Sequence, residues 1–113
     1  MNFFEAQLPG GQSEHISELL KSDLVRVERI VSCGHCSPAG FWYDQEEHEW
    51  VLLVQGAGII EFADGRQVRL NKGDHLDIPA HVKHRVAWTQ PDCETLWLAV
   101  FWSAQTRAEQ RNK

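Results

Sequence analysis

Short apolar segments separated by glycine-containing turns dominate the sequence. Val25, Val27 and Val31 alternate with polar residues, which is the period of a β-strand with one buried face. Asp64-Gly65 is typical of a hairpin turn between two strands. The later apolar stretches predict further strands, at 49–54, 58–62, 67–70, 76–79, 85–88 and 95–102. Seven or eight short strands at this spacing predict an all-β sandwich or barrel.

One short helix is expected before the strands begin. Ser13 is a residue type that caps helix N-termini. Ile16, Leu19 and Leu20 have the spacing of one apolar helix face. We therefore predict a short helical segment in this region of the chain.

The length of the chain predicts one domain. At 113 residues it can bury a single core without disulfides or metals as staples. The predicted domain covers residues 1–113, with a barrel core at about 24–102 and a loose polar tail at 103–113.

Charge and hydropathy exclude two classes of partner. The formal net charge of −5 and the scattered Lys and Arg residues argue against nucleic-acid binding. The sequence contains no run of about 18 apolar residues, so we expect no membrane span. The N-terminus lacks the charged and apolar regions of a signal peptide, so a cytoplasmic location is expected.

The stretch Cys33-Gly34-His35-Cys36 equals the motif of protein disulfide isomerases, but its context does not suit redox catalysis. Such a site places its first cysteine at a helix N-terminus, whereas Pro38 disfavours a helix here. A zinc site would need Cys93 as the remaining thiol. We expect two ordinary loop cysteines in a reduced compartment.

Two longer stretches carry a resemblance to a known family. The stretch 42–56, WYDQEEHEWVLLVQG, resembles the first motif of the cupin superfamily, in which a His-x-His pair precedes a Glu and a Gly. The stretch 73–84, GDHLDIPAHVKH, resembles the second motif, with a matching Gly, Pro and His84. The resemblance implies a small jelly-roll β-barrel that pairs as a homodimer.

The chain departs from the family pattern at the His-x-His pair. Those positions hold Tyr43 and Gln45, or Trp42 and Asp44 if one more residue separates the pair from the Glu. A Gly of the second motif is replaced by His81. The metal-binding half of the family site is therefore degraded in this sequence.

The residues that remain still predict a metal site. Glu49 offers a carboxylate oxygen and His84 an imidazole nitrogen to a divalent ion. Gln45, or Asp44 in the shifted register, could add an oxygen, and His81 could complete the site or act as a general acid or base. Fe, Mn, Ni and Zn all suit such a mixed set. The alternative is a direct hydrogen bond between Glu49 and His84 in a pocket without metal.

Aromatic and polar residues near the motifs predict a small-molecule pocket. His48 would reach it only if the strand begins after that residue, because neighbours on a strand face opposite ways. The predicted pocket residues are Trp42, Tyr43, Asp44, His48, Trp88 and Phe101.

Two functions of different class follow from these residues. The first is a metal-dependent enzyme that acts on a small polar metabolite, with His81 as the candidate catalytic residue. The second is a non-catalytic module that binds or senses a small molecule, which the missing His-x-His pair favours. The fold alone cannot choose between them.

Overall fold

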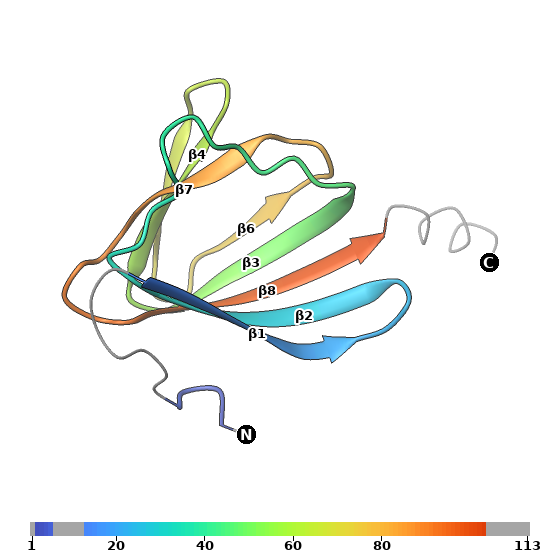
Figure 1. Cartoon of the computed structure of the whole chain (residues 1–113), viewed down its shortest axis with the longest axis horizontal. Coiled ribbons are helices and arrows are strands. Elements are labelled where there is room, and N and C mark those ends of the chain that lie inside the picture. The colour runs from blue at the N-terminus through green and yellow to red at the C-terminus, as the bar shows by residue number, and fades with distance from the viewer. Residues whose placement is uncertain (1, 6–12, 104–113) are drawn as a thin grey trace.

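The protein consists of two facing antiparallel β-sheets (Figure 1). The computed structural model describes residues 2–5 and 13–103. The sheet order is β1-β2-β8-β3-β6 in one sheet and β5-β4-β7 in the other. The strands are β1 (Ser13–Lys21), β2 (Val25–Cys33), β3 (Glu47–Gln55), β4 (Ala57–Phe62), β5 (Gln67–Asn71), β6 (His75–Ile78), β7 (His84–Thr89) and β8 (Thr95–Ser103).

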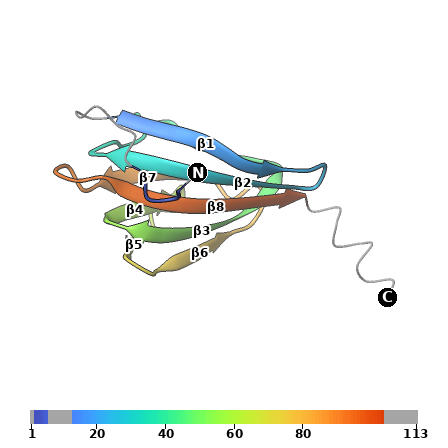
Figure 2. The ribbon, with the colours of Figure 1, turned by 90° about the horizontal axis from the view of Figure 1, so that it is seen from below.

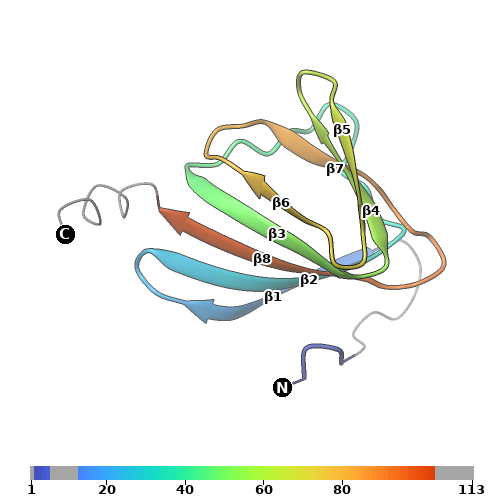
Figure 3. The ribbon, with the colours of Figure 1, turned by 180° about the vertical axis from the view of Figure 1, so that it is seen from behind.

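The all-β prediction is confirmed, and the strands lie close to the predicted segments. Strand pairing within the described ranges forms two separate sheets, and it does not join them into one closed barrel. Figure 2 shows the strands of the larger sheet side by side, and Figure 3 shows β4, β5 and β7 standing across it. Of the predicted tail at 103–113, Ser103 belongs to β8, and residues 104–113 lie outside the described residues.

The core forms between the inner faces of the two sheets. Alternate residues of each strand point inward, as the period of two requires. Leu53 and Ala99 are completely buried there. The buried apolar cluster contains Val51, Leu53, Ile60, Phe62, Leu70, Ile78, Trp97, Ala99 and Phe101.

The predicted N-terminal helix is wrong, because this segment forms β1 at the edge of the larger sheet. β1 pairs with β2, and the register shifts between Glu18 and Leu20. This β-bulge inserts one residue, so the side-chain alternation changes face after it. Ile16 therefore shares the cavity face with its partner Ile30, whereas Leu20 lies beside Val27 on the other face, so the helix-like spacing marks no single apolar face.

A buried arginine attaches the N-terminal segment to the larger sheet. Arg29 of β2 is 0% exposed. Its Nη1 donates hydrogen bonds to the carbonyl oxygens of Asn2, Phe3 and Glu5, at 3.4, 3.0 and 3.2 Å. Asn2, Phe3 and Glu5 therefore lie against β2 although they precede Arg29 by 27, 26 and 24 positions.

Two further predictions concern a membrane span and a homodimer. Among residues 2–5 and 13–103, no helix is long and apolar enough to cross a membrane. β1 is an edge strand and exposes Ile16 and Leu20, by 52% and 60%. Exposed apolar edges favour association, but the homodimer stays a prediction.

Candidate functional site

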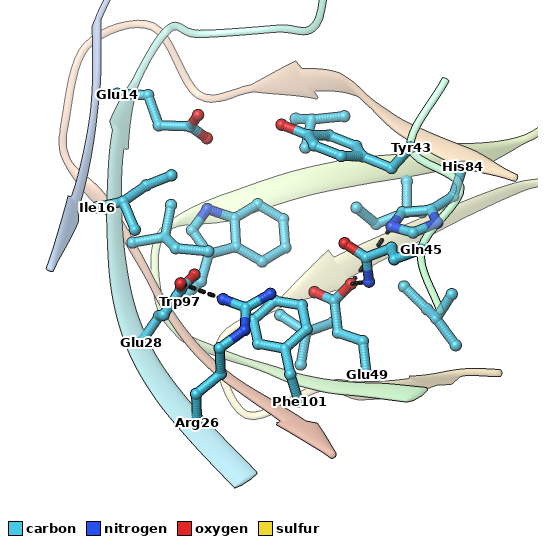
Figure 4. Close-up of a pocket in the computed structure, with 15 residues that line it drawn as sticks. Glu14, Ile16, Arg26, Glu28, Tyr43, Gln45, Glu49, His84, Trp97 and Phe101 are labelled. Carbon is cyan, nitrogen blue, oxygen red and sulfur yellow. Dashed lines mark hydrogen bonds and ion pairs between the residues drawn. The ribbon is translucent and has the colours of Figure 1, made fainter. Parts of the chain in front are cut away.

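A partly open cavity of about 260 Å³ lies between the two sheets, and Figure 4 shows the side chains that line it. Apolar side chains form most of its wall, and polar side chains converge on it from several strands and one loop. Its lining residues are Glu14, Ile16, Arg26, Glu28, Ile30, Tyr43, Gln45, Glu49, Val51, Ile60, Ile78, His84, Val86, Trp97 and Phe101. This form is typical of a small-molecule site.

The two residues that connect the sequence motifs meet in this cavity. The Oε1 atom of Glu49 lies 3.3 Å from Nε2 of His84. It also lies 3.3 Å from Nε2 of Gln45, which donates a hydrogen bond to it. Glu49 and His84 are only 8% and 5% exposed. The predicted contact between distant motifs is therefore present, and Gln45 rather than Asp44 joins it.

Backbone geometry holds His84 in this orientation. Nδ1 of His84 lies 2.9 Å from the carbonyl oxygen of Val82, to which it donates a hydrogen bond. Burial lowers the pKa of His84, but the hydrogen bond to Glu49, the hydrogen bond to Val82 and the charge of Glu49 outweigh it, so the pKa is raised. Both ring nitrogens face acceptors, an arrangement that favours the protonated imidazolium beside the Glu49 carboxylate.

The loop between β2 and β3 brings Tyr43 and Gln45 to the cavity. Its backbone pairs with β7, because the Tyr43 N–H donates to the His84 carbonyl at 2.8 Å and the His84 N–H donates to the Tyr43 carbonyl at 3.2 Å. The ring of Tyr43 stacks on that of His84, with centroids 5.5 Å apart. Residues of the degraded first motif are thus fixed over the second.

His81 lies outside the cavity. Its side chain is 62% exposed, and Nδ1 pairs with the carboxylate of Asp44 at 2.8 Å. Its φ of 65° is the left-handed conformation that glycine adopts without strain, which accounts for the glycine in the family motif. The His81 N–H also donates to the Gln45 carbonyl at 2.8 Å. His81 therefore connects two loops at the surface and is not placed to act on a molecule in the cavity.

The other predicted pocket residues divide into two groups. Tyr43 and Phe101 line the cavity. His48 faces the other side of its sheet, where it accepts a hydrogen bond from the Ala80 N–H at 3.0 Å. The guanidinium carbon of Arg69 lies over the ring of Trp88, 5.1 Å from the ring centroid. Trp42, Asp44, His48 and Trp88 do not line the cavity that the described residues form.

Sequence analysis missed a group of charged residues on β1 and β2. Glu14 and Glu28 line the cavity beside Arg26. Arg26 pairs with Glu28, and it also contacts Glu47 at 2.8 Å. Glu14 is absent from the predicted pocket residues because its segment is predicted to be a helix and not a strand of the sheet. The alternation of Arg26 and Glu28 with the valines of their strand places both on one face, but it predicts that face to be exposed and not to line a cavity.

Electrostatic repulsion acts among these carboxylates. Burial raises the pKa of Glu14, the nearby His35 lowers it and Glu28 raises it, with a net rise. Burial also raises the pKa of Glu28 against the opposing effect of Arg26, and Glu49 adds to the rise. Burial and the charges of Glu14, Glu49 and Glu28 raise the pKa of Tyr43. The cavity therefore holds negative charge at the expense of stability.

The donor set does not fit a tightly held divalent metal. Catalytic zinc sites use three protein ligands, most often imidazole, thiolate or carboxylate. Only Glu49 and His84 supply such ligands here, and the amide of Gln45 directs its nitrogen at Glu49. Within residues 2–5 and 13–103 no group of three or more His, Cys, Asp or Glu side chains could hold an ion. The three cysteines are free thiols, so a zinc site at Cys33 and Cys36 gains no support.

Comparison with known proteins identifies the family. Residues 37–101 match the Cupin domain family. The chain belongs to the cupin superfamily. A Ralstonia eutropha protein with the provisional name mannose-6-phosphate isomerase shares 43% identity with this cupin, with a TM-score of 0.84 over 92% of this chain and 97% of that one.

More distant cupins share the fold. A cupin superfamily protein from Desulfitobacterium hafniense is 21% identical, with a TM-score of 0.72 over 88% of this chain and 84% of that chain. An RmlC-like cupin from Desulfovibrio desulfuricans is 16% identical, with a TM-score of 0.73 over 90% and 93%. No protein of curated function matches this cupin. The architecture is thus shared widely, and the chemistry must be argued from the cavity.

The repulsion predicts an unusual response to a neutral substitution. Replacing Glu14 by glutamine is expected to raise the free energy of unfolding at pH 7 by less than about 1 kcal/mol, since a partly solvated charge is screened. Because the pKa of Glu14 is raised on folding, the gain should vanish as the pH falls and the native carboxyl becomes protonated. Urea denaturation at pH 7 and pH 4 measures this. A loss of stability at pH 7 would contradict it.

Proposed function

We propose that this cupin is a small-molecule binding protein whose cavity receives a small polar metabolite without metal-dependent chemistry. The observation that carries this proposal is the cavity of about 260 Å³, in which polar side chains converge between apolar walls. That volume lies just below the range of about 300–1,000 Å³ that is usual for ligand pockets. The occupant is therefore small, on the scale of one sugar ring.

The Gln45–Glu49–His84 group supports binding more than catalysis. Glu49 Oε1, Gln45 Nε2 and both ring nitrogens of His84 have partners within the group or on the backbone, at 2.9 to 3.3 Å. Such a group presents fixed hydrogen-bond donors and acceptors to a ligand. A metal-dependent enzyme would need a further ionisable ligand from outside this set.

An isomerase is the second candidate, and one comparison favours it. The protein with 43% identity carries the provisional name mannose-6-phosphate isomerase. An aldose–ketose isomerisation moves a proton between neighbouring carbons, and the Glu49–His84 pair has the chemistry of a general base and acid. The substrate would also need a phosphate site, for which Arg26 is the lining cation besides His84, and two carboxylates already engage it.

Purified protein without an affinity tag can separate these functions. We expect divalent metals well below one equivalent per chain and an organic molecule released on denaturation, detected by mass spectrometry. The Val86→Phe variant should fold but lose that molecule, because a larger side chain fills the cavity at a lining position. Val54→Phe is the matched control, since Val54 is a half-buried strand residue outside the lining.

Two results would contradict the binding proposal. One is a stoichiometric metal ion that is lost in both Glu49→Ala and His84→Ala. The other is conversion of mannose 6-phosphate to its ketose isomer by the purified protein, with loss of that activity in Glu49→Gln. Either result would replace the binding module with an enzyme.

A further inference from the structure

The polar wall of the cavity carries an excess of negative charge. Carboxylates reach it from three adjacent or nearby strands, as Glu14 of β1, Glu28 of β2 and Glu49 of β3. The described lining residues include one permanent cation, Arg26, and one histidine, His84. Three ionised carboxylates against Arg26 and at most one imidazolium leave at least one negative charge on the wall. Figure 4 shows Glu14 and Glu28 along one side of the cavity and the Glu49–His84 pair on the other.

Arg26 is not free to bind an anionic ligand. Its Nη1 pairs with Glu28, and its Nε and Nη2 donate to Glu47, with Nη2 at 2.8 Å. Its guanidinium carbon also lies 3.9 Å from the ring centroid of Phe101. The hydrogen bond to Glu47 raises the pKa of Arg26 most, and the surrounding carboxylates add to it. Glu28 and Glu47 both pair with Arg26, so the region around Arg26 carries two carboxylates for one cation. Glu47 itself lies outside the cavity lining.

A hydrogen-bond donor on a largely buried side chain faces the same space. Trp97 is only 3% exposed and lines the cavity. Its indole N–H makes no hydrogen bond to any residue of 2–5 or 13–103, and its nitrogen is not one of the fully buried, unpartnered polar atoms of those residues, so it is accessible from the cavity. In Figure 4 the ring lies among the cavity side chains, with its nitrogen on the side of Glu14 and Ile16. This donor is available to an oxygen of a molecule in the cavity.

Close packing behind Trp97 fixes this donor in place. A Cβ atom at Gly58 of β4 would come within 2.6 Å of the indole ring. The ring therefore cannot move back toward β4, and the absence of a side chain at Gly58 is what allows it to sit between the sheets. The orientation of the N–H group is a property of the folded protein before any ligand binds.

We propose that the cavity selects a small organic cation, namely a protonated amine that also carries hydroxyl groups. This inference rests on the proposed binding function and specifies its ligand class. The ammonium group donates hydrogen bonds to the carboxylates of Glu14 and Glu28. A hydroxyl oxygen accepts the hydrogen bond of the Trp97 N–H, and the carbon skeleton packs against Ile16 and Ile30. A phosphorylated sugar is disfavoured, because its charge would meet the carboxylates.

Three probes of similar size and different charge test this ligand class. They are glucosamine at a pH at which its amine is protonated, glucose, and mannose 6-phosphate. Binding is followed by the indole N–H resonance of Trp97 in two-dimensional NMR, assigned with the Trp97→Phe variant. We expect a saturable shift with glucosamine and a dissociation constant for glucose at least about tenfold weaker, the effect of one hydrogen bond to a charged group. Mannose 6-phosphate should leave the resonance unchanged.

Variants then assign the charge to specific residues. Glu14→Gln and Glu28→Gln should each weaken glucosamine binding by about tenfold while glucose binding stays the same. Glu46→Gln is the matched control, because Glu46 is an exposed carboxylate outside the lining. Raising the salt concentration should weaken glucosamine binding in the wild type more than in the two cavity variants.

The outcomes separate this inference from the proposed function. If glucose or mannose 6-phosphate binds as tightly as glucosamine, the charge selectivity is overturned while the binding function stands. If none of the three probes shifts the Trp97 resonance, the ligand class is overturned as well. The proposed function is decided independently, by the metal content and by the organic molecule released from the purified protein.

Discussion

Replacing Glu49 by leucine is expected to destabilise the protein by about 3 kcal/mol at pH 6. The substitution removes one partner of a buried charged pair, in which the side chains of His84 and Glu49 are 6% and 10% exposed. The imidazolium of His84 would then remain buried beside apolar walls, or lose its proton. Urea denaturation followed by tryptophan fluorescence measures the change.

The size of this effect should depend on pH in a defined direction. Folding raises the pKa of His84 above its ordinary value of 6.5. The contribution of the pair is therefore fully present below about pH 6.5 and is lost as the pH rises through the raised pKa of the folded state. The difference between wild type and Glu49→Leu should be larger at pH 6 than at pH 9.

Two variants control for other effects of the leucine. Glu46→Leu changes an exposed carboxylate and should alter stability by less than about 0.5 kcal/mol. The double variant Glu49→Leu, His84→Leu removes both charges and should recover part of the loss at pH 6. An equal loss at both pH values, or no recovery in the double variant, would show that the pair contributes no charge interaction.

Gly56→Ala is expected to destabilise the protein by roughly 3–4 kcal/mol. Gly56 directly follows β3 and has a φ of +90°, which a residue with a Cβ atom adopts only with strain. A Cβ atom there would also lie 2.5 Å from Oγ1 of Thr95, at the start of β8. Thr95 is completely buried and cannot move aside. Strain and steric overlap therefore act together, and the free energy of unfolding in urea reports their sum.

Gly73→Ala is the matched control for the overlap. Gly73 has the same φ of +90°, but a Cβ atom there would meet no atom within 4 Å. The control should lose only about 1–2 kcal/mol, the cost of the left-handed conformation. Equal losses in the two variants would refute the steric role of Thr95. The comparison tests whether the close contact between Gly56 and Thr95 helps to hold β3 against β8.

Most of the fold could be predicted because strand signals are local. Alternation in Val25 to Val31 and the turn at Asp64-Gly65 identify strands and a hairpin without knowledge of distant residues. The segment at Ser13–Lys21 was assigned to the wrong structure for a physical reason. A β-bulge changes its alternation, and its pairing with β2 decides its conformation.

The candidate site was predicted only where a motif marked it. Glu49 and His84 stand at motif positions and meet as expected. Glu14, Arg26 and Trp97 carry no motif, and nothing near them in sequence indicates that they face one space. His81 shows the opposite error. It became a candidate because it stands at a motif position, but its side chain pairs with Asp44 at the surface and lies outside the cavity.

By itself, the sequence determined the strand-rich architecture, the family and the pair of ionisable groups at the motifs. It did so because side-chain period, turn chemistry and motif spacing act over a few residues. Only the tertiary structure decided which charges line the cavity, since the register between strands selects the face on which each side chain lies. That register placed Glu14 and Glu28 across from Glu49, and it thereby made the cavity acidic.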